Sequence, residues 1–378
     1  MKRLHMCLDL TSHPQVGGGQ FAWQIASGLW CLGKYEIDGV AHREDVHTLP
    51  FKVRRGFFPK RYFYNRQPWH RFCPFTYNTL VGDFRSDVSM FFTNTMPILR
   101  MRGKTIAMIY DLIPFRVPEL LLKDRYTKES LSVYCRQHEY LAHHADKVVT
   151  ISEYSRREIA KEFGLHEDDV PVVPCGVNAA RFATLAEGDR PEAEVKAKYG
   201  LPDRFILYFG TTATYKNVAN LIRGYARLPD TIRRNTPLVV THVNDELRRV
   251  AGEEGVSSQV KFLGYVDEMD KPSLYRLASA YGFLSRIEGF GLTPLEAMSA
   301  GVPTLVSNCA TLPEVVGDGA LVVGPDDLDG IAVGFERLLE DGAFRDELVE
   351  KGRRRAAQFT WDPPVLKMAE VIDNLIRD

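Results

Sequence analysis

Short apolar stretches alternate with amphipathic ones along the chain, and this alternation limits the folds that the sequence can adopt. Short apolar runs predict buried strands, and apolar residues at helical spacing predict helices between them. Strands that alternate with helices are typical of parallel sheets covered on both faces. Each half of the chain begins with a pattern of strand, small-residue loop and helix, at residues 3–32 and again at 205–225. The sequence therefore predicts an α/β protein of two doubly wound domains with a cleft between them.

The domain boundaries follow from the spacing of these elements. Expected strands of the first half are residues 3–10, 88–92, 105–110, 147–151 and 170–173. Expected strands of the second half are residues 205–209, 237–241, 260–262, 281–284, 304–307 and 320–323. A polar stretch up to about residue 191 separates the two, so the domains are predicted to span 1–178 and 191–360. A final helix at 361–378 either caps the second domain or crosses back to the first.

Composition restricts the class of protein. The 378 residues are enough for two domains of ordinary size. Residues 1–180 carry 24 Lys and Arg against 19 Asp and Glu, whereas residues 181–378 carry 24 against 30. The six cysteines form no C-x-x-C pair, so neither a zinc site nor a disulfide framework is indicated. No signal peptide or membrane span is recognised. We therefore expect a cytoplasmic protein, either free or peripheral on the inner face of the membrane.

Residues 51–77 combine basic and aromatic side chains in an unusual way. No acidic residue lies between Asp45 and Asp83, and many arginines, lysines and aromatic residues interleave there. The pattern fits an anionic membrane surface with lipid-linked phosphates, or single-stranded nucleic acid. It also fits a helical insertion whose aromatic side chains pack on their own domain. Because no nucleic-acid motif accompanies the segment, we favour the membrane among the functional interpretations and expect no nucleic-acid partner.

The stretch 285–301 holds two glutamates in a glycine-containing loop and the segment after it. Glu288 follows an apolar run, at the carboxyl end of an expected strand, where open α/β sheets bind ligands. Gly289 and Gly291 allow a ligand to approach the backbone closely. The sequence Thr293-Pro294-Leu295-Glu296 predicts a helix with a threonine cap and a capping-box glutamate. Capping alone would be a sufficient role for Glu296, whereas the position of Glu288 favours a ligand site.

Other strand ends carry further candidates. The loop at 210–217 contains Thr211 and Thr212 and ends near Lys216, at the start of the next expected helix. An ammonium group at that place can meet a phosphate held by helix amides, although an ordinary surface lysine is the alternative. In the first half, Asp111 follows another expected strand.

The first strand is followed by a glycine-rich loop, which contains Gly17, Gly18 and Gly19. Such a loop is either a flexible turn or a place where a substrate meets the backbone. The loop does not have the G-x-G-x-x-G spacing, so NAD binding is not expected.

Several of these motifs together resemble a known family. The sequence Glu288-Gly289-Phe290-Gly291-Leu292-Thr293-Pro294-Leu295-Glu296 is similar to the E-x7-E signature of retaining glycosyltransferases of family 4, which have the GT-B fold. The agreement extends from about residue 105 to 320 and includes Tyr110-Asp111-Leu112-Ile113-Pro114, Phe209-Gly210-Thr211 and Lys216-Asn217. The first hundred residues match only in their glycine loop.

The resemblance implies an α/β fold of GT-B type, with two doubly wound, Rossmann-like domains facing a central cleft. The N-terminal domain would bind the acceptor, and the C-terminal domain would bind a nucleotide-sugar donor. The resemblance implies neither a cofactor nor a metal.

The same resemblance implies roles for single residues. Glu288 would contact hydroxyls of the transferred sugar, Lys216 would neutralise the leaving diphosphate, and Asp111 would complete the catalytic set. Glu296 would bind the ribose hydroxyls of the donor. The remaining donor-side residues would be Gly289, Phe290, Gly291, Leu292, Thr211, Thr212 and Arg286. The acceptor side would include Gly17, Gly18, Gly19 and Tyr110.

Two positions depart from the family pattern. Tyr215 stands where relatives often have an arginine before the lysine, and Arg286 is a candidate to replace that charge. Tyr110 stands where many relatives have a histidine, so no catalytic histidine is expected there.

The resulting hypothesis is a metal-independent retaining transferase. It would move a hexose, with mannose from GDP-mannose as the first candidate, to a lipid-linked or polysaccharide acceptor in cell-surface glycan synthesis. The alternatives are a GT-B epimerase or phosphorylase, or a non-enzymatic two-lobed sugar or nucleotide binder.

Overall fold

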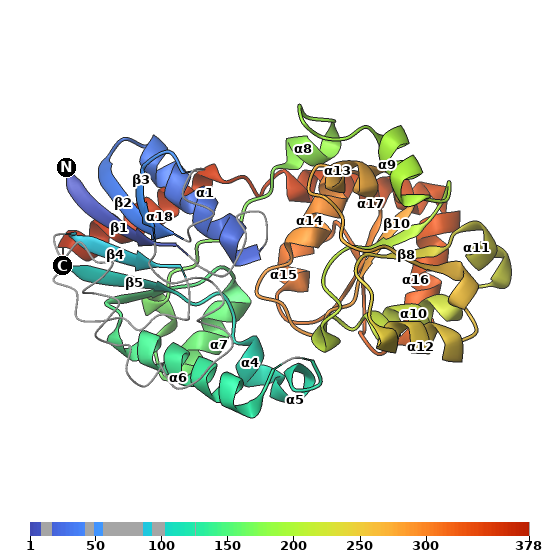
Figure 1. Cartoon of the computed structure of the whole chain (residues 1–378), viewed down its shortest axis with the longest axis horizontal. Coiled ribbons are helices and arrows are strands. Elements are labelled where there is room, and N and C mark those ends of the chain that lie inside the picture. Colours follow the sequence, from blue (N-terminus) through green and yellow to red (C-terminus); the bar gives the residue numbers. More distant parts are fainter. Residues whose placement is uncertain (9–16, 42–48, 56–85, 93–102, 125, 378) are drawn as a thin grey trace. The chain divides into compact units, whose positions relative to one another are not determined.

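The structure is a computed structural model that describes residues 1–8, 17–41, 49–55, 86–92, 103–124 and 126–377. The chain divides into two compact units, each built around its own parallel sheet (Figure 1). The first unit contains Met1–Pro118, Tyr126–Gly176 and Trp361–Asp378, and the second contains Glu119–Arg125 and Val177–Thr360. The predicted α/β class with two Rossmann-like sheets is confirmed.

The sheet of the first unit has the strand order of a doubly wound nucleotide-binding fold. Its strands, in spatial order, are β3 (Lys52–Arg55), β2 (Tyr35–Ala41), β1 (Lys2–Cys7), β4 (Val88–Phe91), β5 (Lys104–Met108) and β6 (Lys147–Val149). All neighbouring strands pair in parallel. The strand expected at 170–173 is only an isolated bridge between Thr150 and Val172.

Strands β2 and β3 were absent from the sequence prediction. In β2, buried Tyr35 and Ile37 alternate with Glu36 and Asp38, which are more exposed. This alternation is the pattern of a strand and could have identified β2. Strand β3 lies inside the basic and aromatic segment, so a helix is wrong for its four residues. From residue 56 onward that segment lies outside the described residues.

The helices of the first unit cover both faces of its sheet (Figure 1). They are α1 (Gly17–Cys31), α4 (Ile113–Arg116), α6 (Lys128–His144), α7 (Glu153–Phe163) and α18 (Asp362–Arg377). A further short helix, α5 (Pro118–Leu121), lies where the chain passes from one unit to the other. Helix α7 is capped at both ends, because Ser152 Oγ accepts the Ser155 N–H at 3.0 Å and Gly164 closes the helix at φ 64°.

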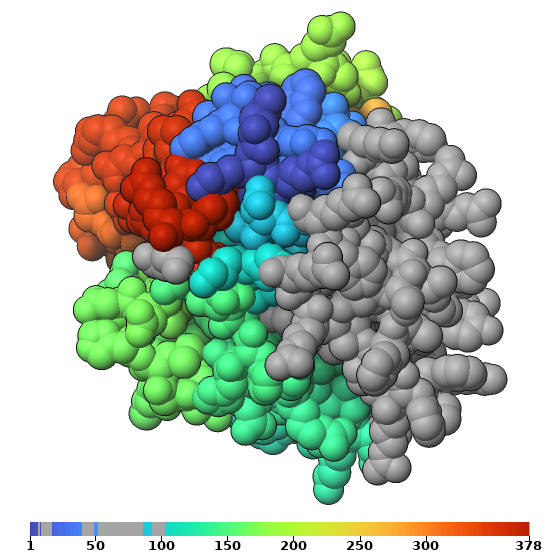
Figure 2. Space-filling model, turned by 90° about the vertical axis from the view of Figure 1, so that its left-hand side faces the viewer, coloured from blue at the N-terminus to red at the C-terminus, as the bar shows by residue number. Residues whose placement is uncertain are grey.

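The last helix, α18, belongs to the first unit and packs on α1. The two helices approach so closely that a Cβ on Gly28 would lie 2.3 Å from a methyl carbon of Val365. The hydroxyl of Tyr35 donates to the Ala369 carbonyl at 3.2 Å and to Asp373 Oδ1 at 3.0 Å. Figure 2 shows this dark red helix beside the blue N-terminal segment. The C-terminal helix therefore completes the core of the N-terminal unit.

The second sheet also has a doubly wound order. Its strands, in spatial order, are β12 (Leu321–Val323), β11 (Thr304–Ser307), β10 (Ala280–Phe283), β7 (Ile206–Tyr208), β8 (Leu238–Val240) and β9 (Val260–Phe262). Strands β8 and β9 follow β7 on one side of it, whereas β10, β11 and β12 lie in order on its other side. The carboxyl ends of β7 and β10 therefore flank the point at which the strand order reverses, where such sheets bind ligands.

Helices flank this sheet and fix the loops at its carboxyl edge. The helices are α8 (Ala179–Ala183), α9 (Glu192–Tyr199), α10 (Val218–Ala226), α11 (Asp230–Asn235), α12 (Asp245–Glu253), α13 (Lys271–Arg276), α14 (Leu292–Ser299), α15 (Leu312–Val316), α16 (Leu328–Glu340) and α17 (Gly342–Ala356). Within the described residues, we find no helix that is both long and apolar enough to cross a bilayer.

Candidate active site

The loops after β7 and β10 bring Lys216 and Glu288 together at the carboxyl edge of the second sheet. Lys216 Nζ lies 2.7 Å from Glu288 Oε1 and 2.9 Å from Oε2, so the ammonium bridges both oxygens. Both side chains are largely buried, with exposed fractions of 15% and 10%. Lys216 ends a short 3-10 turn (Thr214–Lys216) just before α10. The sequence placed these residues on separate motifs, and the fold pairs them.

Hydrogen bonds fix the backbone around Lys216. The Arg286 N–H donates to the Tyr215 carbonyl at 2.9 Å, and Ser285 Oγ donates to the same carbonyl at 3.3 Å. Asp124 accepts hydrogen bonds from both the N–H and the hydroxyl of Thr214, at 3.1 and 2.9 Å to its nearest oxygens. The loop that carries Lys216 is therefore bonded to the loop that carries Glu288.

Asn217 follows Lys216 in the left-handed conformation, at φ 59°. Its side-chain amide donates to the Pro325 carbonyl at 2.8 Å. His242 and Ala310 also have positive φ, and both lie in loops that follow strands of this sheet. Non-glycine residues held in this conformation cluster at functional sites. Within the described chain, these three strained residues all gather at the edge that carries Lys216 and Glu288.

Arg286 faces an acidic partner in the loop after β12. Its guanidinium forms two hydrogen bonds with the Asp326 carboxylate, one of them 2.8 Å long. The hydrogen bond from Arg286 lowers the pKa of Asp326, and Asp326 in turn raises the pKa of Arg286. Tyr215, which stands at the expected arginine position, has its ring centroid 5.2 Å from Lys216 Nζ.

The capping box predicted for the helix after Glu288 is wrong. Helix α14 begins at Leu292, with Gly291 as its N-cap at φ 113° and without a side-chain cap. Glu296 does not reach back to the helix terminus. Its carboxylate accepts instead from Lys271 Nζ at 2.6 Å and from the Tyr275 hydroxyl at 3.0 Å, both on α13.

Glu296 is almost completely buried, with 3% of its side chain exposed. Burial raises the pKa of its carboxyl group, while the charge and hydrogen bond of Lys271 oppose that rise. Lys271 and Tyr275 were not among the predicted site residues. The sequence signal for them is weak, because a lysine and a tyrosine four residues apart on a short helix resemble an ordinary amphipathic surface.

The remaining donor-side candidates line the same edge of the sheet. The Thr211 carbonyl accepts from the Tyr208 hydroxyl at 2.5 Å, and Thr212 is contacted by the Asn244 amide at 3.4 Å. Gly289 and Phe290 are buried, and Phe290 packs edge-on against Phe359 with ring centroids 5.8 Å apart. Thr211 is exposed and Leu292 is half-buried.

The acceptor-side candidates lie in the first unit. The three glycines form the first turn of α1 and not a loop, which corrects the sequence prediction. The Tyr110 hydroxyl donates to the Phe92 carbonyl at 3.0 Å and lies 3.4 Å from the Gly18 carbonyl. Asp111 Oδ1 accepts from the Ile113 N–H at 3.0 Å, at the start of α4. The structure thus brings Tyr110 and Gly18 together, with Asp111 next in the chain.

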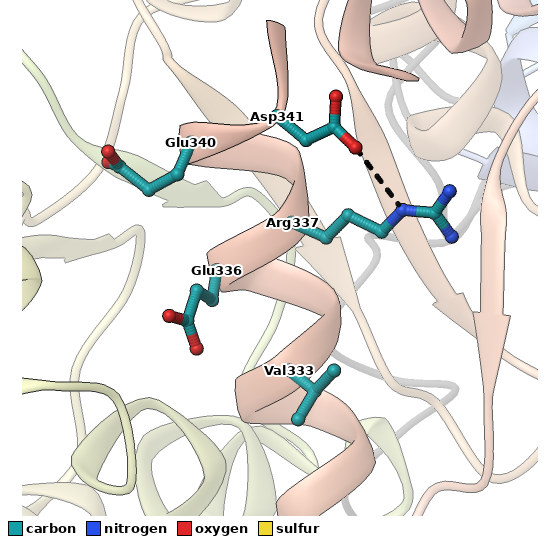
Figure 3. Close-up of a pocket in the computed structure, with 5 residues that line it drawn as sticks. All are labelled: Val333, Glu336, Arg337, Glu340 and Asp341. Carbon is teal, nitrogen blue, oxygen red and sulfur yellow. Dashed lines mark ion pairs between the residues drawn. The ribbon is translucent and has the colours of Figure 1, made fainter. Parts of the chain in front are cut away.

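A surface hollow on α16 contains none of the predicted site residues (Figure 3). Its lining residues are Val333, Glu336, Arg337, Glu340 and Asp341. Arg337 forms a 3.8 Å ion pair with Asp341. The buried residues of α16 face the sheet, and the hollow lies on other positions of the helix. We assign no ligand to it.

Among the described residues, no group of three or more His, Cys, Asp and Glu side chains could hold a metal ion, and metal independence stays a prediction.

Comparison with known proteins identifies the family. Residues 17–181 match the family described as Glycosyltransferase Family 4, and residues 189–355 match Glycosyl transferases group 1. The chain is 33% identical over 266 residues to the O-antigen chain mannosyltransferase B of Escherichia coli, covering 68% of this chain and 67% of that protein. It is 33% identical over 276 residues to the serotype-specific mannosyltransferase WbdA of Escherichia coli, and spans about a third of that protein's length.

Solved structures agree in fold over the full chain. A glycosyltransferase involved in lipopolysaccharide biosynthesis, WaaG, matches with a TM-score of 0.74 at 16% identity, covering 98% of this chain and 99% of that one. A sucrose-phosphate synthase from Thermosynechococcus elongatus matches with a TM-score of 0.72 at 18% identity, covering all of both chains. The chain belongs to glycosyltransferase family 4, a family of retaining hexosyltransferases with the GT-B fold.

Proposed function

We propose that this protein transfers a mannosyl unit from GDP-mannose to a lipid-linked or polysaccharide acceptor in cell-surface glycan synthesis. The mannosyl unit is favoured because both Escherichia coli relatives are described as mannosyltransferases and one as an O-antigen enzyme. Family membership favours a transferase over an epimerase, a phosphorylase or a non-enzymatic binding protein. The chain spans only part of these relatives, so the substrates are argued from the site.

The observation that carries the proposal is the Lys216–Glu288 pair at the strand-order reversal of the second sheet. In the proposed complex, the Lys216 ammonium turns toward the diphosphate and stabilises the negative charge that grows as the sugar departs. Glu288 then accepts hydrogen bonds from hydroxyls of the transferred sugar. The amides of Phe290 to Leu292 lie near the sugar and the diphosphate, and Thr211, Thr212 and Arg286 complete the donor side.

The two glutamates have different partners, which favours different roles. Glu288 is paired with Lys216, whereas Glu296 is paired with Lys271 and Tyr275. Retaining hydrolases instead divide the work of acid and nucleophile between two carboxylates. We therefore favour attack by the acceptor hydroxyl on the same face of the transferred sugar as the one from which the leaving group departs. The departing phosphate would remove the hydroxyl proton, and Glu296 would hold the ribose.

On the acceptor side, we propose that Gly17, Gly18, Gly19 and Tyr110 border the acceptor and that Asp111 serves the reaction from the first unit. The acceptor would be presented at the inner face of the membrane. Residues 51–77 are proposed to bind anionic lipid there. Replacing Arg54, Arg55, Lys60 and Arg61 by Ser is expected to lower binding to anionic liposomes, most at low salt. An unchanged pelleting fraction would remove this part of the proposal.

The decisive experiment offers a panel of GDP- and UDP-sugars together with a membrane extract and measures nucleotide release and sugar incorporation. GDP release from GDP-mannose, with label appearing in lipid or polysaccharide, is the expected result. Preference for a UDP-sugar would contradict the donor, and no release from any donor would overturn the transferase proposal.

A further inference from the structure

Lys271 occupies a buried site between Glu296 and aromatic rings. Its ammonium lies 2.6 Å from Glu296 Oε1, 5.2 Å from the ring centroid of Phe209 and 5.7 Å from that of Phe182. Only 8% of the Lys271 side chain and 3% of the Glu296 side chain are exposed. Two opposite charges have thus been removed from water at the edge of the sheet that carries Lys216 and Glu288.

Stability alone is a poor reason for such a pair. Replacing a buried ion pair with apolar residues of similar volume is often neutral or stabilising, because desolvation offsets the attraction. The neighbouring aromatic rings, including Tyr275 and Tyr281, would accommodate an apolar pair in this place. A role that needs the charge of Glu296 explains the pair better.

Helix α13 is held firmly where it supplies Lys271. The adjacent Asp270 has a fully buried side chain that accepts from Lys198 Nζ at 2.5 Å and from the Tyr199 hydroxyl at 2.7 Å. Arg190 also donates to this carboxylate. These contacts join α13 to α9, so that the ammonium and the hydroxyl that face Glu296 come from a fixed support.

The contacts of Glu296 leave part of its carboxylate available. An ionised carboxylate offers about four lone-pair positions on its two oxygens. Lys271 uses one position on Oε1, and Tyr275 uses one on Oε2. One further acceptor position on each oxygen matches two hydroxyls on neighbouring carbon atoms, such as those of a ribose.

We propose that Lys271, supported by Tyr275, is a positioning residue that holds Glu296 as a fixed, charged acceptor for the two ribose hydroxyls of the donor. The site would thereby select ribonucleoside diphosphates over their deoxy analogues. This inference rests on the proposed function, which assigns Glu296 to the ribose.

A purely structural role, in which the pair only joins α13 to α14, makes a different prediction. Loss of Lys271 would then weaken every nucleotide equally or lower only stability. The positioning role instead predicts that loss of Lys271 reduces the contribution of the ribose hydroxyls to the binding affinity. In the variant, that contribution should also depend on pH. The charged or titratable groups near Glu296 are Lys271 and Tyr275 from α13, Tyr281 from β10, and Glu268. Burial keeps the pKa of both tyrosines far above neutral, so neither titrates near neutral pH.

The experiment measures the affinities for GDP and 2′,3′-dideoxy-GDP by calorimetric titration of the full chain at several pH values. The wild-type protein is expected to prefer GDP at least about tenfold, because the dideoxy analogue lacks both hydroxyls that would donate hydrogen bonds to the charged carboxylate. Lys271→Met is expected to reduce that preference to about twofold at acidic pH, with partial recovery at alkaline pH as Glu296 ionises. The affinity for dideoxy-GDP should stay unchanged.

Three further variants make the result specific. Lys271→Arg keeps the charge and should restore most of the preference. Tyr275→Phe removes one donor without an unpaired charge and should reduce the preference by a smaller factor, even if Lys271→Met does not fold. Lys198→Met changes another lysine that supports α13 without touching Glu296, and should leave the preference unchanged.

The outcomes separate the inference from the proposed function. If the wild-type protein binds GDP and dideoxy-GDP equally, the proposed ribose contact of Glu296 is wrong, and the inference falls with it. If the wild-type protein discriminates and Lys271→Met and Tyr275→Phe discriminate equally well at every pH, only the inference is overturned. Lys271 would then be a structural residue beneath a ribose site that works without it.

Discussion

At the scale of single residues, the pairing of Lys216 with Glu288 couples two groups that a donor would separate. The ammonium bridges both carboxylate oxygens in a largely buried place. A diphosphate that draws Lys216 away leaves Glu288 in need of new donors, and sugar hydroxyls can supply them. Under the proposed function, a donor that carries both a diphosphate and sugar hydroxyls would give each of the two side chains a new partner, which neither an isolated sugar nor an isolated phosphate would do.

Glu288→Gln tests this coupling. The amide keeps the shape of the side chain but cannot balance the charge of Lys216 or accept hydroxyls on two charged oxygens. We expect kcat/KM for transfer to fall by about 10²–10³, the range for loss of one electrostatic contact in a transition state. The variant should stay folded at the assay temperature, although loss of the buried charge that faces Lys216 lowers its melting temperature. Glu336→Gln, on the exposed surface of α16, is the matched control. Near-normal turnover of Glu288→Gln would assign Glu288 a structural role only.

Asn217 shows how one backbone conformation positions the preceding lysine. Asn217→Ala places an alanine in the left-handed region, which costs roughly 1–2 kcal/mol. It also removes the hydrogen bond from the side-chain amide to the Pro325 carbonyl, which contributes about 1 kcal/mol. Asn217→Gly removes the same bond but tolerates the conformation. We expect the alanine variant to lose more stability and more kcat/KM than the glycine variant, as measured by urea unfolding and transfer assays. Equal losses would show that the hydrogen bond to Pro325, and not the backbone conformation, fixes Lys216.

At the scale of elements, the packing of α18 on α1 depends on the absence of a side chain at Gly28. A Cβ there would lie 2.3 Å from a methyl carbon of Val365, and a branched valine cannot turn out of the way. Gly28→Ala is therefore expected to destabilise the first unit by about 1–3 kcal/mol, the usual cost of overpacking. This would exceed the gain in helix propensity, about 1 kcal/mol.

Two comparison variants isolate the steric cause. Val365→Ala combined with Gly28→Ala should be more stable than the sum of the single changes predicts, as measured by urea unfolding. Gly252→Ala in α12 introduces a methyl group whose nearest neighbour is 3.7 Å away. It should be neutral or slightly stabilising. If Gly28→Ala behaves in the same way as Gly252→Ala, the helices are not packed as closely as the structure indicates.

The elements also show which features the sequence could predict. The caps of α7, Ser152 and Gly164, act within their own helix, so a local sequence pattern is enough to predict them. The cap of α14 was mispredicted because Glu296 forms its strongest contact with Lys271, 25 positions away in the chain. A local pattern cannot reveal a partner that only the fold supplies. Strand β2 differs from this case, because the alternation of apolar and charged residues at 35–38 is local and is present in the sequence.

The same limit applies to the site. Glu288 and Lys216 were predicted because each follows a strand in a recognisable motif, and the sheet topology brings such ends together. Asp124, Asp326 and Lys271 lie in segments without such motifs, yet they bond to Thr214, Arg286 and Glu296. Their roles depend on tertiary contacts, which cannot be predicted from the spacing of residues in the chain.

At the scale of the whole molecule, the two units have separate cores, and α18 returns the end of the chain to the first one. Each unit can therefore show its own unfolding transition in calorimetry. The proposed donor contacts of Lys216, Glu288 and Glu296 all lie in the second unit. A ligand stabilises the state that it binds, by about 2.7 kcal/mol at a hundredfold excess over its dissociation constant.

We therefore expect GDP at that excess to raise one of two calorimetric transitions by roughly 5–10 °C, given about 2–4 °C per kcal/mol for units of this size. Gly28→Ala identifies the transitions, because it should lower that of the first unit and leave the other in place. GDP should raise the transition that Gly28→Ala does not lower. Lys216→Met combined with Glu296→Gln should abolish most of the shift, because these two side chains are the ones proposed to contact the diphosphate and the ribose of GDP. A shift confined to the transition that Gly28→Ala lowers would place the nucleotide in the first unit and contradict the assignment of the donor to the second sheet.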